Sequence, residues 1–287
     1  MRTSTEIGST SYVVGEEKAI ELVAKAGFDA WDFSMMRMWE MDWATNRVTE
    51  HNHPLLTNDY LKYARQLKQI GLDNGIVCNQ AHAPFPPTHP TIRKVLKRSI
   101  ECAAEAGAEI IVVHPLHTKN VEENAEYYAD LLAFAKGCGI KIATENMWLW
   151  DDELDQAKFA SCATPESFCA HIDALHDENM VACLDIGHAE MRGSGTSAVE
   201  LIHALGHRLQ ALHIHDNDKW KDLHQIPFSM SIDFPPIVKA LKEIGYAGFF
   251  TLEADYYWPE FTADDAQKRM NDLYASVKKL ADMYENA

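Results

Sequence analysis

The chain has 287 residues, 47% of them apolar, which is enough to bury a large core in one domain. Its 43 acidic and 26 basic residues give a formal net charge of -17, which repels phosphate backbones and anionic lipids. We therefore expect neither a nucleic-acid partner nor a membrane partner. The N-terminus lacks the apolar run of a signal peptide, and the six cysteines form no CxxC pair, so we expect a cytoplasmic protein with reduced thiols.

Short apolar runs alternate with longer amphipathic segments along the chain. The runs expected to form buried strands cover residues 4–10, 27–35, 74–82, 108–115, 140–146, 180–188, 209–216 and 247–255. Helices are expected between them, most clearly over 15–26, 88–106, 121–138, from Thr164 onward, and over 263–286. Eight βα units without an internal linker predict a single-domain (β/α)8 TIM barrel over residues 1–287. No GxGxxG follows the first strand, which argues against a dinucleotide-binding sheet.

Long polar and aromatic segments follow several of the predicted strands. Residues 39–54, WEMDWATNRVTEHNHP, are expected to form a loop that covers the substrate as a lid. The aromatic residues after strand ends are Trp39, Trp148, Trp150, Tyr256, Tyr257 and Trp258. Because sugar C–H faces pack well on aromatic rings, they predict an aromatic mouth, with lid packing or a subunit contact as the alternative.

Titratable side chains occur at the ends of six consecutive apolar runs. They are His82, His114, Glu145, Asp185 with His188, His213 with His215, and Glu253, and the segment KDLHQIP adds Asp222 and His224. The C-terminal ends of barrel strands meet at one rim, so we expect these side chains to converge. Buried carboxylates need a compensating positive charge, which a divalent cation supplies. Carboxylate and imidazole donors suit Zn²⁺, Mn²⁺, Co²⁺ or Mg²⁺, and no thiolate ligand is expected; a metal-free polar mouth is the alternative.

Other polar residues have structural interpretations. His215 shares a strand face with His213 and is expected to form a polar wall or to support a ligand, whereas Asp216 points the other way and orients a loop. His51, His53 and His117 are expected to be solvated loop residues. The segment RGSGTS, residues 192–197, is a weak candidate for a phosphate site, so an unphosphorylated substrate is favoured.

On these residues the sequence resembles the xylose isomerase-like TIM barrel superfamily, especially its sugar phosphate isomerase/epimerase group. The resemblance runs from AGFDAWDF to GFFTLEAD and is most specific in HIHDN, DLHQIP and IDFPPIVKALKEIGYAGFFTLE. It implies a divalent metal held by Glu145, Asp185, His213 and Glu253, with His188 touching a substrate oxygen. Two features depart from the group. PFSMS, residues 227–231, replaces a glycine-rich turn, and Lys219 stands where ketose 3-epimerases tend to have a substrate-binding arginine.

The resemblance predicts an isomerase or epimerase of a small sugar or polyol that works through an enediolate, with Glu145 and Glu253 as the acid/base pair. His82 and His114 would bind substrate oxygens or a second metal. Apurinic-site endonucleases of the same superfamily hold three zinc ions on nine ligands. Those nine are matched in order by His82, His114, Glu145, Asp185, His188, His213, Asp222, His224 and Glu253. The acidic surface favours the sugar. A non-catalytic sugar-binding barrel is a third alternative, and a homo-oligomer is compatible with the resemblance although no heptad indicates one.

Overall fold

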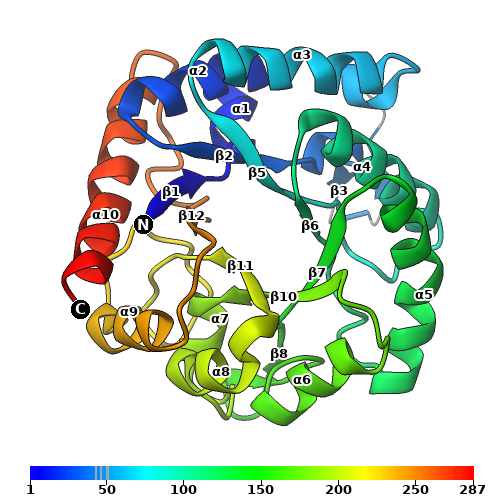
Figure 1. Ribbon diagram of the computed structural model, residues 1–287, viewed down its shortest axis with the longest axis vertical. Coiled ribbons are helices and arrows are strands. Elements are labelled where there is room, and N and C mark those ends of the chain that lie inside the picture. Colours follow the sequence, from blue (N-terminus) through cyan, green and yellow to red (C-terminus); the bar gives the residue numbers. More distant parts are fainter. Residues whose placement is uncertain (43, 46, 50–51) are drawn as a thin grey trace.

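The computed structural model of the chain describes residues 1–42, 44–45, 47–49 and 52–287. Within these ranges eight parallel strands form a ring (Figure 1): β1 (Arg2–Thr5), β2 (Ala30–Ser34), β5 (Val77–His82), β6 (Ile110–Val112), β7 (Lys141–Glu145), β10 (Met180–Asp185), β11 (Leu209–His213) and β12 (Phe249–Leu252). Six strands form one sheet in the order β2-β5-β6-β7-β10-β11, and β1 pairs with β12. Parallel bridges from Glu6 to Asp32 and from Ile214 to Leu252 join the two sheets. The ring is therefore closed, and the prediction of a (β/α)8 barrel is confirmed.

Helices cover the outer face of the ring (Figure 1). They are α2 (Glu16–Ala26), α3 (Tyr60–Asp73), α4 (Ile92–Ala106), α5 (Val121–Gly137), α6 (Pro165–Asp173), α8 (Ala198–Leu205), α9 (Phe234–Glu243) and α10 (Ala266–Asn286). The short helices α1 (Gly8–Val14) and α7 (Ile186–Glu190) directly follow β1 and β10. Local signals set the helix starts: Asn120 and Glu123 form a capping box on α5, and Thr164 caps α6 ahead of Pro165. No helix in the described ranges is long and apolar enough to cross a membrane.

Residues 39–54, expected from the sequence to be a loop, and the segment after β7 each contain a pair of antiparallel strands. Strands β3 (Met41–Asp42) and β4 (Arg47–Val48) pair within residues 39–54, and β8 (Trp148–Asp151) pairs with β9 (Gln156–Phe159). The short 3-10 helices η1 (Met36–Met38), η2 (Pro54–Leu56) and η3 (Gly206–Arg208) complete the connections. His51 lies outside the described residues, and His53 accepts a hydrogen bond from Leu55 N and pairs with Glu16 at 3.1 Å. His53 is therefore part of the packed structure, and its prediction as a solvated residue is wrong.

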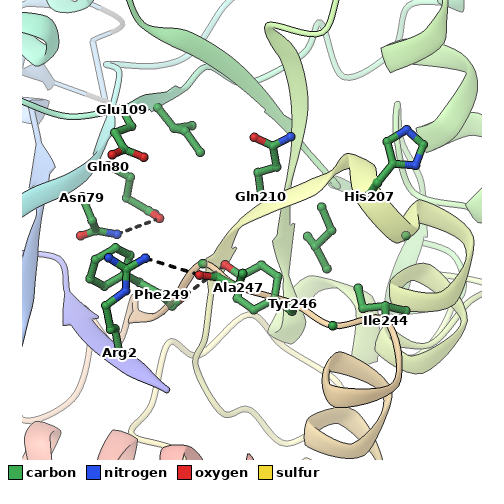
Figure 2. A pocket seen from close by; sticks show the side chains of 15 residues that line it. Arg2, Asn79, Gln80, Glu109, His207, Gln210, Ile244, Tyr246, Ala247 and Phe249 are labelled. Carbon is green, nitrogen blue, oxygen red and sulfur yellow. Dashed lines mark hydrogen bonds between the residues drawn. The ribbon is translucent and has the colours of Figure 1, made fainter.

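The interior of the barrel is partly polar. Asn79 Nδ2 donates to Gln80 Oε1 at 3.3 Å and to Thr251 Oγ1 at 3.2 Å, and Ser4 Oγ donates to Asn79 Oδ1 at 2.6 Å. Below them, at the N-terminal ends of the strands, lies a cavity of about 410 Å³ whose lining includes Arg2, Asn79, Gln80 and Gln210 (Figure 2). The titratable rim residues lie at the opposite, C-terminal ends of the strands.

Candidate metal centre and active site

Four side chains from three strand ends and one adjoining loop form the central group of the site. Glu145, Asp185 and His213 end β7, β10 and β11, and Glu253 directly follows β12. One ligand-type atom from each lies within 4.8 Å of those of the other three. His213 Nδ1 is 2.8 Å from Glu145 Oε1 and 3.4 Å from Glu253 Oε2. The geometry thus brings together the four residues that the resemblance implied as metal ligands.

The central group has the chemistry of a cation site. It sets three carboxylates against one imidazole, and Asp185 is fully buried. Asp185 Oδ2 has no hydrogen-bond partner among the described residues. A buried carboxylate oxygen without a partner costs free energy unless a cation or a proton compensates it. Nitrogen and oxygen donors at this spacing suit Zn²⁺ or Mn²⁺, so the residues present fit a divalent metal.

A second group shares Glu145 with the first. His114 Nε2 lies 3.2 Å and His82 Nε2 lies 3.7 Å from Glu145 Oε2, and the two imidazole nitrogens are 3.1 Å apart. Both histidines lie at the rim, after β6 and at the end of β5. This arrangement agrees with the prediction that they face the site, and both could bind a metal or a substrate oxygen.

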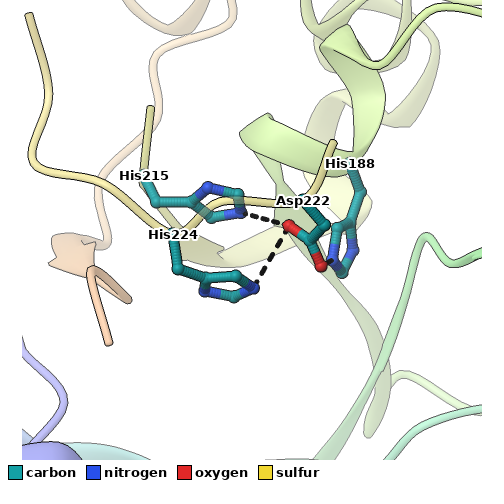
Figure 3. A group of neighbouring side chains, drawn as sticks. All are labelled: His188, His215, Asp222 and His224. Carbon is teal, nitrogen blue, oxygen red and sulfur yellow. Dashed lines mark hydrogen bonds and ion pairs between the residues drawn. The ribbon is translucent and has the colours of Figure 1, made fainter. Parts of the chain in front are cut away.

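A third group gathers around Asp222 (Figure 3). Asp222 faces His188 Nε2 at 3.1 Å, His224 Nε2 at 3.2 Å and His215 Nε2 at 3.5 Å, and the rings of His215 and His224 stack with centroids 4.0 Å apart. His215 Nε2 also lies 3.1 Å from Asp185 Oδ1, which connects this group to the central one. The sequence predicts His215 only as a polar wall or a support for a ligand. In the structure it belongs to a group of four side chains, His188, His215, Asp222 and His224, that could hold a cation.

Backbone carbonyls orient three of these imidazoles. His82, His188 and His224 direct Nδ1 at the carbonyl oxygens of Ala83, Asn146 and Glu253, at 2.8, 2.9 and 2.8 Å. If Nδ1 carries the proton in each pair, Nε2 is left to face the site. Histidines that bind metals are commonly held in this way, because the outer hydrogen bond fixes both the tautomer and the ring orientation.

The segment LDIGH, residues 184–188, owes its spacing to a helix start. Asp185 caps α7 by accepting a hydrogen bond from His188 N at 2.7 Å, so the strand end and the first helical turn present both side chains to the rim. Gly187 between them is required by packing, since a Cβ there would lie 1.9 Å from the His215 ring. Asn146, which had no predicted role, locks Asp185 in place through two backbone hydrogen bonds of 2.8 Å.

The two proposed acid/base carboxyl groups occupy different electrostatic environments. Burial, reinforced by the charge of Glu145, raises the pKa of Glu253 to about 8. Burial also opposes ionisation of Glu145, but the positive charge of His213 and the contacts of His114 and His82 hold its pKa well below the usual range. Two carboxyl groups with pKa values displaced in opposite directions are suited to acid and base roles.

The third and second groups differ in their preferred charge. Burial disfavours a charged His188, yet the carboxylates of Asp185 and Asp222 outweigh it and raise its pKa to about 10. Burial lowers the pKa of His114 to about 4.

Cys183 brings a thiol close to the site, since its sulfur lies within 4.8 Å of ligand atoms of Glu145 and His213. Burial raises the pKa of Cys183 and keeps the thiol protonated, so the absence of a thiolate ligand stays a prediction.

The three groups open into a cavity of about 630 Å³, a volume suited to a small organic ligand. Its aromatic lining comes from Phe85, Trp148, Trp150 and Tyr256, and Trp148 Nε1 donates to Asp222 Oδ2 at 3.2 Å. The predicted aromatic mouth is thus present in part. Trp39, Tyr257 and Trp258 are not among the described residues that line the cavity; Trp39 is buried against His89 instead.

Lysine and histidine residues near the mouth differ from their predictions. Lys219 Nζ pairs with Glu190 at 3.0 Å. Lys219 is not among the described residues that line the cavity, whereas Lys221 is. His117 also lines the cavity, half-buried, with no hydrogen-bond partner for Nε2 among the described residues, so its prediction as a solvated residue is wrong. The sequence gives only a weak signal that Lys221 and His117 line the cavity, because each lies in a loop beyond a strand end.

Asp216 and the segment RGSGTS, residues 192–197, have structural roles. Asp216 accepts hydrogen bonds from Met230 N and Ile232 N, at 2.9 and 3.0 Å, and so orients the loop containing PFSMS as predicted. In RGSGTS, Gly193 lies against the β8–β9 hairpin, where a Cβ would meet Ala157 O at 1.9 Å. The start of α8 is already occupied by Glu190, which accepts from Ala198 N at 3.0 Å. A carboxylate at that helix start leaves an unfavourable place for phosphate.

A closed (β/α)8 barrel with carboxylate and imidazole donors converging at the C-terminal ends of its strands defines a class of barrel whose mouth could hold a metal. The model of the xylose isomerase-like TIM barrel family matches residues 20–273, and the chain belongs to this family. Two relatives are each 28% identical to it. One is the uncharacterized protein MJ1311 of Methanocaldococcus jannaschii, over 253 residues (82% of this chain, 78% of the relative). The other is the uncharacterized protein y4fM of Sinorhizobium fredii, over 258 residues (82% and 79%).

Several solved structures share the fold over nearly the whole chain. A D-tagatose 3-epimerase-like protein has a TM-score of 0.71 at 23% identity, covering 100% of this chain and 99% of that chain. A D-psicose 3-epimerase in the presence of D-fructose has a TM-score of 0.72 at 16% identity, covering 99% of both chains. The IolI protein with a bound zinc atom has a TM-score of 0.73 at 20% identity, also covering 99% of both. At these identities the likeness concerns the fold.

Proposed function

We propose that the protein is a metal-dependent isomerase or epimerase of a small sugar or polyol. The observation that carries the proposal is the pair of carboxyl groups of Glu145 and Glu253, which face the same imidazole and have pKa values displaced in opposite directions. Such a pair suits the removal of a proton from a carbon beside a carbonyl and its return. The names of the similar solved structures, 3-epimerases of ketoses among them, support this class of substrate.

In this proposal Glu145, Asp185, His213 and Glu253 hold a divalent cation, which polarises the substrate carbonyl when bound. Glu145, kept ionised by its imidazole neighbours, takes the proton from carbon. Glu253, whose pKa without a bound metal is raised to about 8, would return a proton from the other side of the substrate. His188, whose Nε2 faces Asp222 at the edge of the cavity, would contact a substrate oxygen, and the aromatic wall of Trp148, Trp150 and Tyr256 would exclude water from the enediolate. Isomerisation and epimerisation share this intermediate.

The site favours a neutral, unphosphorylated substrate. Among the described residues that line the cavity, Lys221 is the single lysine, and the carboxylates of Asp222 and Asp255 lie in the same lining. The net charge of -17 adds to this negative field. A cytoplasmic location and assembly into a homo-oligomer are part of the same proposal.

A second candidate function follows from the number of donor groups. The three groups described above contain all nine residues that match the ligands of trinuclear-zinc apurinic-site endonucleases, and each group could hold one cation. Three adjacent cations would favour hydrolysis of a phosphodiester instead of proton transfer at carbon. The acidic composition argues against a DNA duplex, since phosphate contacts dominate nucleic-acid affinity.

Metal content and proton exchange distinguish the two functions. We expect the purified protein to bind a divalent metal and to incorporate solvent deuterium into one carbon of a ketose or aldose in a substrate screen. Glu145→Gln and Glu253→Gln should each abolish this incorporation, whereas Glu243→Gln, on the surface, should not. Three zinc ions per chain together with cleavage of an abasic duplex would establish the second function instead. Sugar binding with no exchange at any carbon would indicate a non-catalytic barrel.

A further inference from the structure

His213 is held differently from the other imidazoles of the site. It turns Nδ1 toward Glu145 and Glu253, and its Nε2, which has no hydrogen-bond partner among the described residues, has Asp32 Oδ2 as an ion-pair contact at 3.5 Å. His82, His188 and His224 do the reverse, with Nδ1 on a backbone carbonyl and Nε2 toward the site. A carboxylate therefore lies behind His213 where a neutral carbonyl lies behind the others.

Asp32 is fixed in the barrel interior by the polar core. It lies on β2 and is 1% exposed, and its Oδ2 accepts a hydrogen bond from Gln80 Nε2 at 2.9 Å. Gln80 Oε1 in turn accepts from Thr251 Oγ1 at 3.2 Å and from Asn79 Nδ2 at 3.3 Å. Among the described residues the ion-pair contact of Asp32 is with His213 alone, and Oδ1 has no hydrogen-bond partner. The carboxylate thus has a fixed position and faces one cationic group.

We propose that Asp32 is a positioning residue that sets which nitrogen of His213 faces the metal centre, and that Gln80 holds Asp32 in place. A carboxylate behind Nε2 favours a proton on that nitrogen, so Nδ1, which in the metal-free chain donates to Glu145 Oε1 at 2.8 Å, is the nitrogen that a metal in the central group would bind. Outer-sphere carboxylates of this kind orient a histidine and increase its basicity as a ligand. The metal-binding consequence rests on the proposed function, whereas the orientation of the ring does not.

Two readouts of Asp32→Asn, a change of nearly equal volume, test the proposal. We expect the dissociation constant for Zn²⁺, measured by competition with a chelator, to rise about tenfold or more. We also expect the ring Nε2–H proton of His213, assigned by its loss in His213→Gln, to move upfield and exchange faster with solvent. Gln80→Met should change both quantities in the same direction by a smaller factor. Ser4→Ala, which alters the same polar core next to Asn79, should change neither.

The outcomes separate this proposal from the proposed function. If Zn²⁺ binding and the His213 ring proton are the same in Asp32→Asn as in the natural chain, or if Ser4→Ala changes them equally, the role of Asp32 is refuted. If the natural chain binds no metal, the proposed function fails. The ring proton of the metal-free protein then still decides the role of Asp32, because a shift confined to Asp32→Asn and Gln80→Met supports it.

Discussion

At the residue scale, small local features set the donor geometry of the site. His215 occupies the space beside Gly187, which is why LDIGH tolerates no side chain at its fourth position. Asn146 fixes the backbone of Asp185 from the neighbouring strand end, and Asp185 itself caps the helix that carries His188. The orientation of one carboxylate and two imidazoles therefore depends on hydrogen bonds and contacts of individual residues.

Gly187→Ala tests the contact with His215. The added Cβ would lie 1.9 Å from a ring carbon of a fully buried histidine, so we expect the free energy of unfolding to fall by about 1–3 kcal/mol. Urea denaturation measures this change. Gly137→Ala is the matched control, because its Cβ would meet nothing within 4 Å at the end of a helix, and it should be neutral or slightly stabilising. Equal behaviour of the two variants would show that Gly187 is not sterically required.

The pH dependence of stability tests the charge of His188. Its pKa in the folded, metal-free protein is raised to about 10, against about 6.5 in an unfolded chain. A raised pKa stabilises the fold fully below the unfolded value, and the contribution is lost as pH rises through the folded value. We therefore expect the metal-free protein to lose stability between about pH 6.5 and pH 10, and His188→Gln to reduce that slope.

Urea denaturation in a chelator at several pH values measures the slope. His203→Gln is the control for loss of an imidazole, since His203 pairs with Glu243 on the surface. Identical slopes in the natural chain and His188→Gln would contradict the prediction. Added metal should flatten the slope, because a metal binds the deprotonated imidazole.

At the scale of elements, the β8–β9 hairpin is the wall that brings Trp148 and Trp150 to the cavity. The hairpin lies against the loop after α7, where Gly193 has a φ of 91° and approaches Ala157 O. Trp148 Nε1 donates to Asp222, so the wall also touches the third donor group. The glycine-rich segment that resembled a phosphate site thus serves as the surface on which the hairpin packs.

Gly193→Ala should displace this hairpin. A residue with a side chain in the left-handed region costs about 1–2 kcal/mol, and the clash with Ala157 O should add about 1–3 kcal/mol. Gly139→Ala isolates the first cost, because Gly139 has a φ of 74° and open space around its Cβ position. Thermal or urea unfolding with tryptophan fluorescence checks both. The packing role of Gly193 would be refuted if the two variants lost the same stability.

At the scale of the whole molecule, Arg269 joins the two ends of the chain. This residue of α10 is 1% exposed and donates to Thr10 Oγ1 at 2.9 Å, to Ser9 Oγ at 3.1 Å and to the carbonyls of Ala254 and Tyr257. Its contacts therefore hold helix α1, which follows β1, against the segment after β12, which carries Glu253. They lie beside the β1–β12 pairing that completes the ring.

Arg269→Met should lower the free energy of unfolding by about 3 kcal/mol or more, since it breaks the buried hydrogen bonds to Thr10, Ser9 and two backbone carbonyls. Arg65→Met is the control: Arg65 pairs with Glu105 at 3.1 Å on the surface, and its loss should cost at most about 1 kcal/mol. Denaturant unfolding of both variants decides the matter. A loss no larger for Arg269→Met than for Arg65→Met would contradict the role assigned to Arg269.

The barrel fold, and the prediction of which residues lie at its rim, follow from patterns within the sequence. Apolar runs with the spacing of a parallel sheet, separated by amphipathic helices, are local patterns that each strand and helix carries in its own residues. Chain order then predicts that Glu145, Asp185, His213 and Glu253 meet, because the C-terminal ends of parallel barrel strands share one face. The match to the xylose isomerase-like TIM barrel family confirms the resemblance on which these residues were singled out.

The tertiary structure alone decided what lies behind and around these residues. Asp32 faces His213 across the barrel, Lys219 turns to Glu190, His117 faces the cavity, and the wall that carries Trp148 is a hairpin. None of these contacts follows from a local pattern, because each joins segments distant in the chain or depends on the path of a loop. Periodicity specifies the face on which a residue lies, whereas packing in three dimensions selects the neighbour that it meets.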